Sequence, residues 1–171
     1  MHCNDRALST VAKPARYTGG EWNMTVKDPS GVSVRFALAL PDVYEVGMSN
    51  LGLKILYGIL NERTDTYAER AYCPWPDMEA VMRNGKDVLC SLETGTPLKE
   101  FDAVGFSLQY EMTYSNILTM LDLGGIPLAS SDRSERDPLV VGGGPCAFNP
   151  EPLADFFDCF VIGEGEEVIG E

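Results

Sequence analysis

Side chains that could hold a ligand gather in residues 41–50 of this 171-residue sequence, which read PDVYEVGMSN. An apolar run typical of a buried strand precedes them, and apolar residues at helical spacing follow. In an open parallel sheet such a strand-to-helix connection lies at the carboxyl edge, where ligands bind. The free N–H groups at the helix start favour an anionic group. The candidate ligand contacts in this stretch are Asp42, Tyr44, Glu45, Gly47, Met48 and Ser49.

Two further groups of candidates follow later apolar runs. After residues 102–108 the chain continues through polar side chains, and after residues 138–141 it enters a run of glycines that permits close backbone approach. A polar group at the end of a buried strand needs a partner, which either a ligand or the neighbouring loop would supply. These candidates are Ser107, Gln109, Tyr110, Glu111, Gly142, Gly143 and Gly144.

Each candidate also has a purely structural interpretation. Aspartate caps turns and glycine supplies positive φ, while an apolar contact beneath the loop is the favoured role for Met48. The carboxylates of Asp42 with Glu45 or Glu111 could perform acid–base chemistry, but the single histidine, His2, lies near the N-terminus and no nucleophile–base pair is evident. We therefore do not expect this chain to be an enzyme by itself.

The elements that must position these residues alternate between strand and helix. We expect strands at residues 32–40, 66–73, 102–108, 138–141 and 158–162. Helices are expected over 50–61, from the proline-containing start at 74–77 to about 84–85, and after Glu111. A short strand at 126–129 and a short helix after residue 150 are also predicted, whereas 88–92 is either an edge strand or an irregular connection. The pattern predicts a Rossmann-like, flavodoxin-type, doubly wound α/β fold: three layers around a mostly parallel five-stranded sheet of order 2-1-3-4-5.

The first 30 residues are expected to form an arm that leads into one domain over residues 31–171. We expect Tyr17 and Trp22 to anchor this arm by packing, and the first half-dozen residues to be disordered. A net charge of −13 argues against binding to nucleic acid or to anionic membranes. No signal peptide or membrane span is apparent, so a cytoplasmic location is expected. The five scattered cysteines are expected to be reduced and mostly buried, without a zinc site or an iron–sulfur cluster.

The loops at the three strand ends contain sequence patterns that resemble those of a known family. The patterns Asp42-x-Tyr44-x-x-Gly47, Ser107-x-Gln109 and Gly142-Gly143 resemble the cobalamin-binding signature D-x-H-x-x-G, S-x-L and G-G. In that family the histidine ligates cobalt, and the serine and glycines line the slot for the nucleotide tail. Tyr44 stands at the histidine position and Gln109 at the leucine position, so the resemblance implies cobalamin binding without a histidine lower ligand.

Longer strings are similar to the cobalamin-binding-type radical S-adenosylmethionine (SAM) proteins, at residues 41–52, 105–111, 143–145, 149–152 and 162–166. The resemblance implies a downstream radical SAM barrel in cis, carrying S-adenosylmethionine and a 4Fe-4S cluster on a C-x-x-x-C-x-x-C motif. That motif is absent here, so the chain is either truncated or an isolated first domain. We expect truncation, because residues 168–171 stop just as a helix starts. A cofactor-less docking or substrate-recognition domain is the alternative, and flavin or nucleotide binding is a third reading from fold analogy alone. The substrate, small or macromolecular, stays open.

Overall fold

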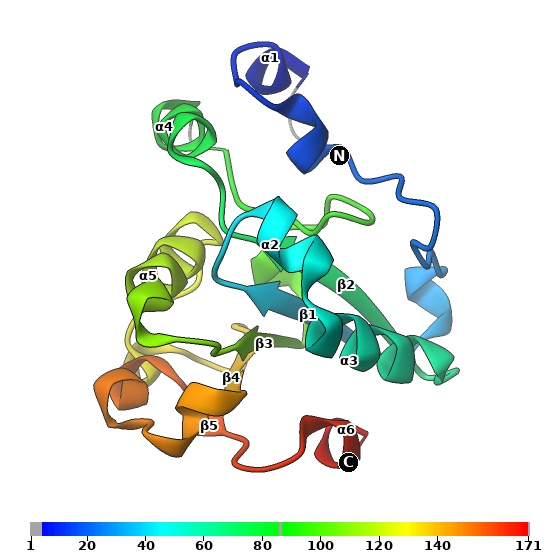
Figure 1. Cartoon of the computed structure of the whole chain (residues 1–171), viewed down its shortest axis with the longest axis vertical. Coiled ribbons are helices and arrows are strands. Elements are labelled where there is room, and N and C mark those ends of the chain that lie inside the picture. The colour runs from blue at the N-terminus through cyan, green and yellow to red at the C-terminus, as the bar shows by residue number, and fades with distance from the viewer. Residues whose placement is uncertain (1–4, 86, 171) are drawn as a thin grey trace.

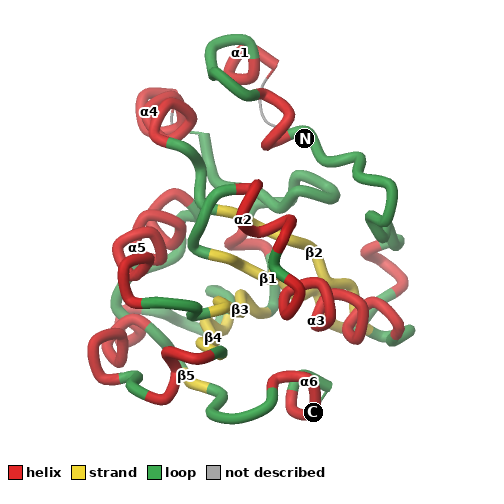
Figure 2. The backbone as a smooth tube through the Cα atoms, viewed as in Figure 1, coloured by secondary structure: helices red, strands yellow, loops and turns green. Residues whose placement is uncertain are grey.

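The computed structural model describes residues 5–85 and 87–170, and contains one five-stranded, entirely parallel sheet (Figures 1 and 2). The strand order is β2-β1-β3-β4-β5, which confirms the predicted flavodoxin-type topology. The strands are β1 (Val34–Leu40), β2 (Thr66–Tyr72), β3 (Ala103–Ser107), β4 (Leu139–Gly143) and β5 (Cys159–Phe160).

Helices cover both faces of the sheet because successive side chains of each strand point to opposite faces. Leu38 and Leu40 of β1 pack in one hydrophobic cluster with Leu53 and Leu60, whereas Ala37 and Ala39 belong to a second cluster beneath other helices. This gives the predicted three layers. The helices are α1 (Asp5–Leu8), α2 (Tyr44–Ser49), α3 (Leu51–Glu62), α4 (Pro76–Gly85), α5 (Tyr114–Leu123) and α6 (Gly165–Val168).

Several predicted elements differ from the structure. Residues 44–49, expected to be loop, form helix α2, in which the Gly47 amide donates to the Val43 carbonyl at 3.0 Å. No strand forms at 126–129, where Gly125 has a φ of +70° and Pro127 lacks an amide donor. Residues 88–92 are an irregular connection with a single bridge between Cys90 and Pro97. The helix after residue 150 is a 3-10 helix, and β5 is only two residues long.

The N-terminal arm packs onto the domain, although not through both predicted anchors. Ala7 and Val11 are buried, and the Tyr17 hydroxyl accepts a hydrogen bond from the Trp75 amide at 3.1 Å. Trp22 is 103% exposed, so its predicted anchoring role is wrong. Of the residues expected to be disordered, 1–4 lie outside the described part of the chain, whereas α1 already begins at Asp5. The arm boundary at residue 30 stays a prediction.

Strand β2 is an edge strand whose outward-facing backbone is capped from within the chain. The Asn61 side chain bonds both the amide and the carbonyl of Ala68, at 3.1 and 3.0 Å. The Glu93 carboxylate accepts from the Arg70 amide at 2.6 Å, and the Leu92 amide donates to the Arg70 carbonyl. These partners replace the sixth strand that an open edge would attract. Within the described residues no helix is long and apolar enough to span a membrane.

Candidate functional site

The chain segments that follow β1 and β3 meet at the carboxyl edge of the sheet, because these two strands are neighbours. The Tyr110 hydroxyl donates to Asp42 Oδ2 at 2.6 Å, and the Asn116 amide donates to the Pro41 carbonyl at 2.9 Å. The hydrogen bond to the Asp42 carboxylate raises the pKa of Tyr110. This is the topological switch point of the fold, and it brings together side chains 68 positions apart in the sequence.

The segments after β3 and β4 also lie side by side. The Leu108 amide donates to the Gly143 carbonyl at 2.7 Å, and the Cys146 amide donates to the Leu108 carbonyl at 3.0 Å. The Gln109 side chain donates to Ser107 Oγ at 2.7 Å. The predicted serine motif and the glycine run are therefore adjacent, with Glu111 exposed in the 3-10 turn that precedes α5.

The three glycines of this run serve different purposes. A Cβ on Gly142 would lie 2.8 Å from the Phe160 ring, so packing alone explains this residue. Gly144 has a φ of +102° and closely approaches the Leu108 carbonyl, which favours glycine at this turn. A Cβ on Gly143 would meet its nearest neighbour, Val161, at 4.0 Å. Gly143 is therefore the glycine of the run beside which a ligand has most room.

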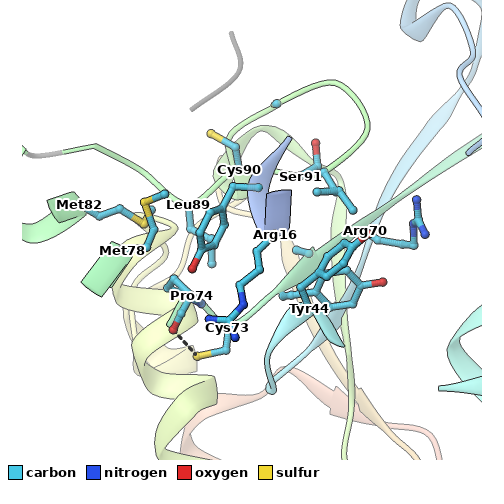
Figure 3. Close-up of a pocket in the computed structure, with 15 residues that line it drawn as sticks. Arg16, Tyr44, Arg70, Cys73, Pro74, Met78, Met82, Leu89, Cys90 and Ser91 are labelled. Carbon is cyan, nitrogen blue, oxygen red and sulfur yellow. Dashed lines mark hydrogen bonds between the residues drawn. The ribbon is translucent and has the colours of Figure 1, made fainter. Parts of the chain in front are cut away.

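Tyr44 faces away from the switch point. Its hydroxyl donates to Glu21 Oε1 at 2.9 Å, and its ring packs edge-on against Tyr72 at 5.8 Å between centroids. Burial, reinforced by the neighbouring Glu21 carboxylate, raises the pKa of Tyr44 to about 12. The phenol is consequently protonated at neutral pH and already has a hydrogen-bond partner. Figure 3 shows Tyr44 next to Arg70, on the side of the cavity toward β2.

The other candidates on α2 make structural contacts. Glu45 pairs with Arg16 at 2.9 Å and with Lys13 at 3.2 Å. A Cβ on Gly47 would overlap the Tyr72 ring, and Ser49 Oγ donates to carbonyls of its own helix. The structure thus leaves Asp42 as the predicted site residue of the 41–50 segment whose side chain bonds across the switch point.

The sulfur of Met48 lies 3.1 Å from Arg70 Nη1 and 3.5 Å from the Tyr72 hydroxyl. Its side chain also packs against the apolar cluster beneath α3. A contact beneath the segment was the favoured expectation for Met48, and the structure places it there, beside a guanidinium as well as apolar groups.

A small cavity lies at the carboxyl end of β2, on the opposite side of β1 from the switch point (Figure 3). Its volume of about 40 Å³ leaves room for roughly three water molecules. Arg16 and Tyr17 of the arm, Arg70, Tyr72 and Cys73 contribute to its wall. Burial raises the pKa of the Cys73 thiol to about 12, so this cysteine is protonated and is not an activated nucleophile.

Sequence reasoning missed the buried ionic cluster beside this cavity. Arg70 donates through Nε to Glu93 at 2.5 Å and through Nη2 to Glu21 at 3.1 Å. The sequence did contain a signal for this cluster, because two charged residues, Glu69 and Arg70, stand in the middle of the predicted strand. In the structure this strand is buried along its whole length. Buried charges must be paired, so their partners had to exist, but the sequence does not say where.

The cysteines and possible metal ligands can be assessed in residues 5–85 and 87–170. Cys73, Cys146 and Cys159 are free thiols in this part. Of the four cysteines described, Cys90 included, only Cys73 is buried, so the expectation of mostly buried cysteines is wrong. No group of three His, Cys, Asp or Glu residues in it could hold a metal ion.

The doubly wound α/β architecture and the switch-point geometry define the class of domain. Comparison with known proteins identifies the family: residues 52–171 match the family described as "Radical SAM proteins, N-terminal", and the chain belongs to it. The match contains Ser107, Gln109 and the glycine run but begins after Asp42 and Tyr44.

One relative is a protein of Methanocaldococcus jannaschii described as "Uncharacterized protein MJ0966". It is 37% identical over 78 residues, which are 44% of this chain and 16% of the relative. The aligned segment therefore spans about a sixth of the relative. No solved structure gave a significant match.

Proposed function

We propose that this chain is the N-terminal module of a radical SAM protein and that it holds a cofactor or substrate at the switch point between β1 and β3. The observation that carries the proposal is the convergence of the Asp42 and Tyr110 segments, joined at 2.6 Å, beside Gly143. The family match supports the placement of the module in a radical SAM protein. S-adenosylmethionine and the 4Fe-4S cluster would belong to a barrel domain outside these 171 residues.

Cobalamin is the cofactor that the sequence resemblance implies, and the residues fit it only in part. Gly143 leaves space beside the backbone, as a nucleotide-tail slot requires. The histidine position does not fit a cobalt ligand, because the Tyr44 phenol is protonated and bonded to Glu21. Any cobalamin bound here would have no lower ligand from Tyr44.

The second candidate is a docking or substrate-recognition domain that holds no cofactor. The observation in its favour is the orientation of Tyr44, which belongs to the contacts between the arm, α2 and β2. In this case the switch point would hold the substrate of the radical SAM protein directly.

Titration with hydroxocobalamin, followed by the corrin absorption bands, separates the two candidates. The native chain should show saturable binding, and Gly143→Val should abolish it, because the new side chain fills the slot at a position where the fold has room. Circular dichroism of Gly143→Val controls for folding. Binding only by Tyr44→His would show a slot that lacks its ligand in the native chain. Absence of binding by all variants would contradict the cofactor role and favour the docking domain.

A further inference from the structure

Three large apolar side chains are exposed on the segments that follow β3 and β4. Met112 is 87% exposed, Phe148 is 71% exposed and Tyr110 is 42% exposed. The two segments are joined by the hydrogen bond from the Cys146 amide to the Leu108 carbonyl. We call these three residues the carboxyl-edge patch. Exposed apolar groups gathered in this way are typical of protein interaction sites.

Tyr114 shows that the two segments stay together beyond their first residues. Its side chain and that of Cys146 pack against the same hydrophobic cluster, and burial, followed by the neighbouring Cys146 thiol, raises the pKa of Tyr114. Met112 precedes Tyr114 by two residues, and Phe148 follows Cys146 by two residues. The apolar side chains therefore flank a contact that holds the β3 and β4 segments against each other.

The charge around this patch has one sign. The segments after the five strands contain no lysine or arginine, at residues 41–53, 73–77, 108–113, 144–152 and 161–167. The last 35 residues, 137–171, likewise contain neither. Within the described residues, the carboxylates of Glu111, Glu151 and Glu164 have no salt-bridge partner, although the arm neutralises Glu45.

We propose that the carboxyl-edge patch is the surface on which the radical SAM barrel of the same polypeptide docks, through a complementary face with an apolar centre and a lysine- and arginine-rich rim. This inference rests on the proposed function, which supplies the barrel. A second copy of the chain would set carboxylates against carboxylates, and a nucleic acid would bring more negative charge. A protein surface with an apolar centre and a basic rim would pack against the apolar residues and pair with the carboxylates.

Hydroxyl-radical footprinting with mass spectrometry tests the docking surface. The 171-residue chain is compared with the longer protein that carries the barrel. Modification of Met112 and Phe148 should be roughly tenfold slower in the longer protein, since the core of a docked interface excludes water. Trp22, which is fully exposed and lies in the arm, should be modified equally in both proteins.

A charge-reversal pair tests the complementarity. In the longer protein, Glu111→Lys with Glu151→Lys should restore fast modification of Met112. The matched control, Asp132→Lys with Glu135→Lys, changes the net charge equally on the loop before β4 and should leave the protection intact.

Two results would overturn the proposal: equal modification rates in both proteins, or protection in the 171-residue chain that increases with its concentration, as a second copy would produce. The corrin titration reports ligand binding independently. Protection without cobalamin binding would therefore support the docking surface while the cofactor role failed.

Discussion

Individual residues of the 41–50 segment have different roles: some lie at the candidate site, and others are required by packing. Asp42 bonds across the switch point, whereas Gly47 is a glycine because the Tyr72 ring occupies the space of its missing Cβ. Topology made the meeting of Asp42 and Tyr110 predictable, since strands one and three are adjacent in the predicted order. The orientation of Tyr44 was not predictable, because its partner Glu21 lies in an arm without periodic structure.

Gly47→Ala should lower the free energy of unfolding by about 1–3 kcal/mol, the usual effect of overpacking a filled site. Gly58→Ala is the matched control, because its Cβ meets nothing within 4 Å in the interior of α3. Alanine there should raise stability by up to about 1 kcal/mol through helix propensity. Urea denaturation measures both changes, and a Gly47→Ala protein as stable as the native chain would contradict the packing explanation.

At the scale of elements, the apolar runs predicted the main strands because burial on both faces selects continuous branched and aromatic residues. Helix α2 escaped prediction because its six residues, YEVGMS, show too little periodicity to distinguish a helix from a loop. Strand β5 is shorter than its apolar run, since its register pairing with β4 extends over Cys159 and Phe160, although the Asp158 and Val161 amides also donate to carbonyls of β4. The apolar pattern of the sequence thus predicts the existence of an element more reliably than it predicts the residue at which the element ends.

The ionic cluster on β2 gives the second prediction. Arg70→Met leaves the Glu93 carboxylate buried without its guanidinium and should cost about 3–5 kcal/mol of stability. Arg83→Met is the control, because it breaks exposed pairs with Glu79 and Asp122 and should cost less than about 1 kcal/mol. Thermal and urea unfolding distinguish the two. Similar losses in both variants would show that the cluster is no stronger than a surface pair.

At the scale of the whole molecule, the arm is attached to the domain partly through charge. Hydrogen bonding from Arg16, assisted by Lys13, lowers the pKa of the Glu45 carboxyl to about 2, against about 4.3 in an unfolded chain. A carboxyl with a lowered folded pKa contributes stability above its unfolded pKa and loses it as pH falls. The contribution of Glu45 is therefore complete above about pH 4.3 and disappears as pH approaches 2.

Calorimetry of Glu45→Gln measures this contribution. The native chain should have the higher Tm at pH 7, and the difference should close progressively as the pH is lowered through this range. Glu62→Gln, at the exposed end of α3, is the matched control and should leave the Tm at pH 7 close to that of the native chain. A gap of constant size for Glu45→Gln would mean that the arm is held by its buried residues, such as Ala7 and Val11, without a contribution from charge.

The capped edge at β2 also limits how copies of this molecule can associate through their sheets. With Asn61, Leu92 and Glu93 bound to the backbone of β2, edge-to-edge pairing has only the β5 side available in the part of the chain that the structure describes. Two molecules joined through β5 would use up both free edges, so the assembly would close as a symmetric pair. A filament needs two open edges on every subunit, and the sheet formed by residues 5–85 and 87–170 offers one. The chain is therefore protected against fibre growth by sheet extension for as long as these caps remain in place.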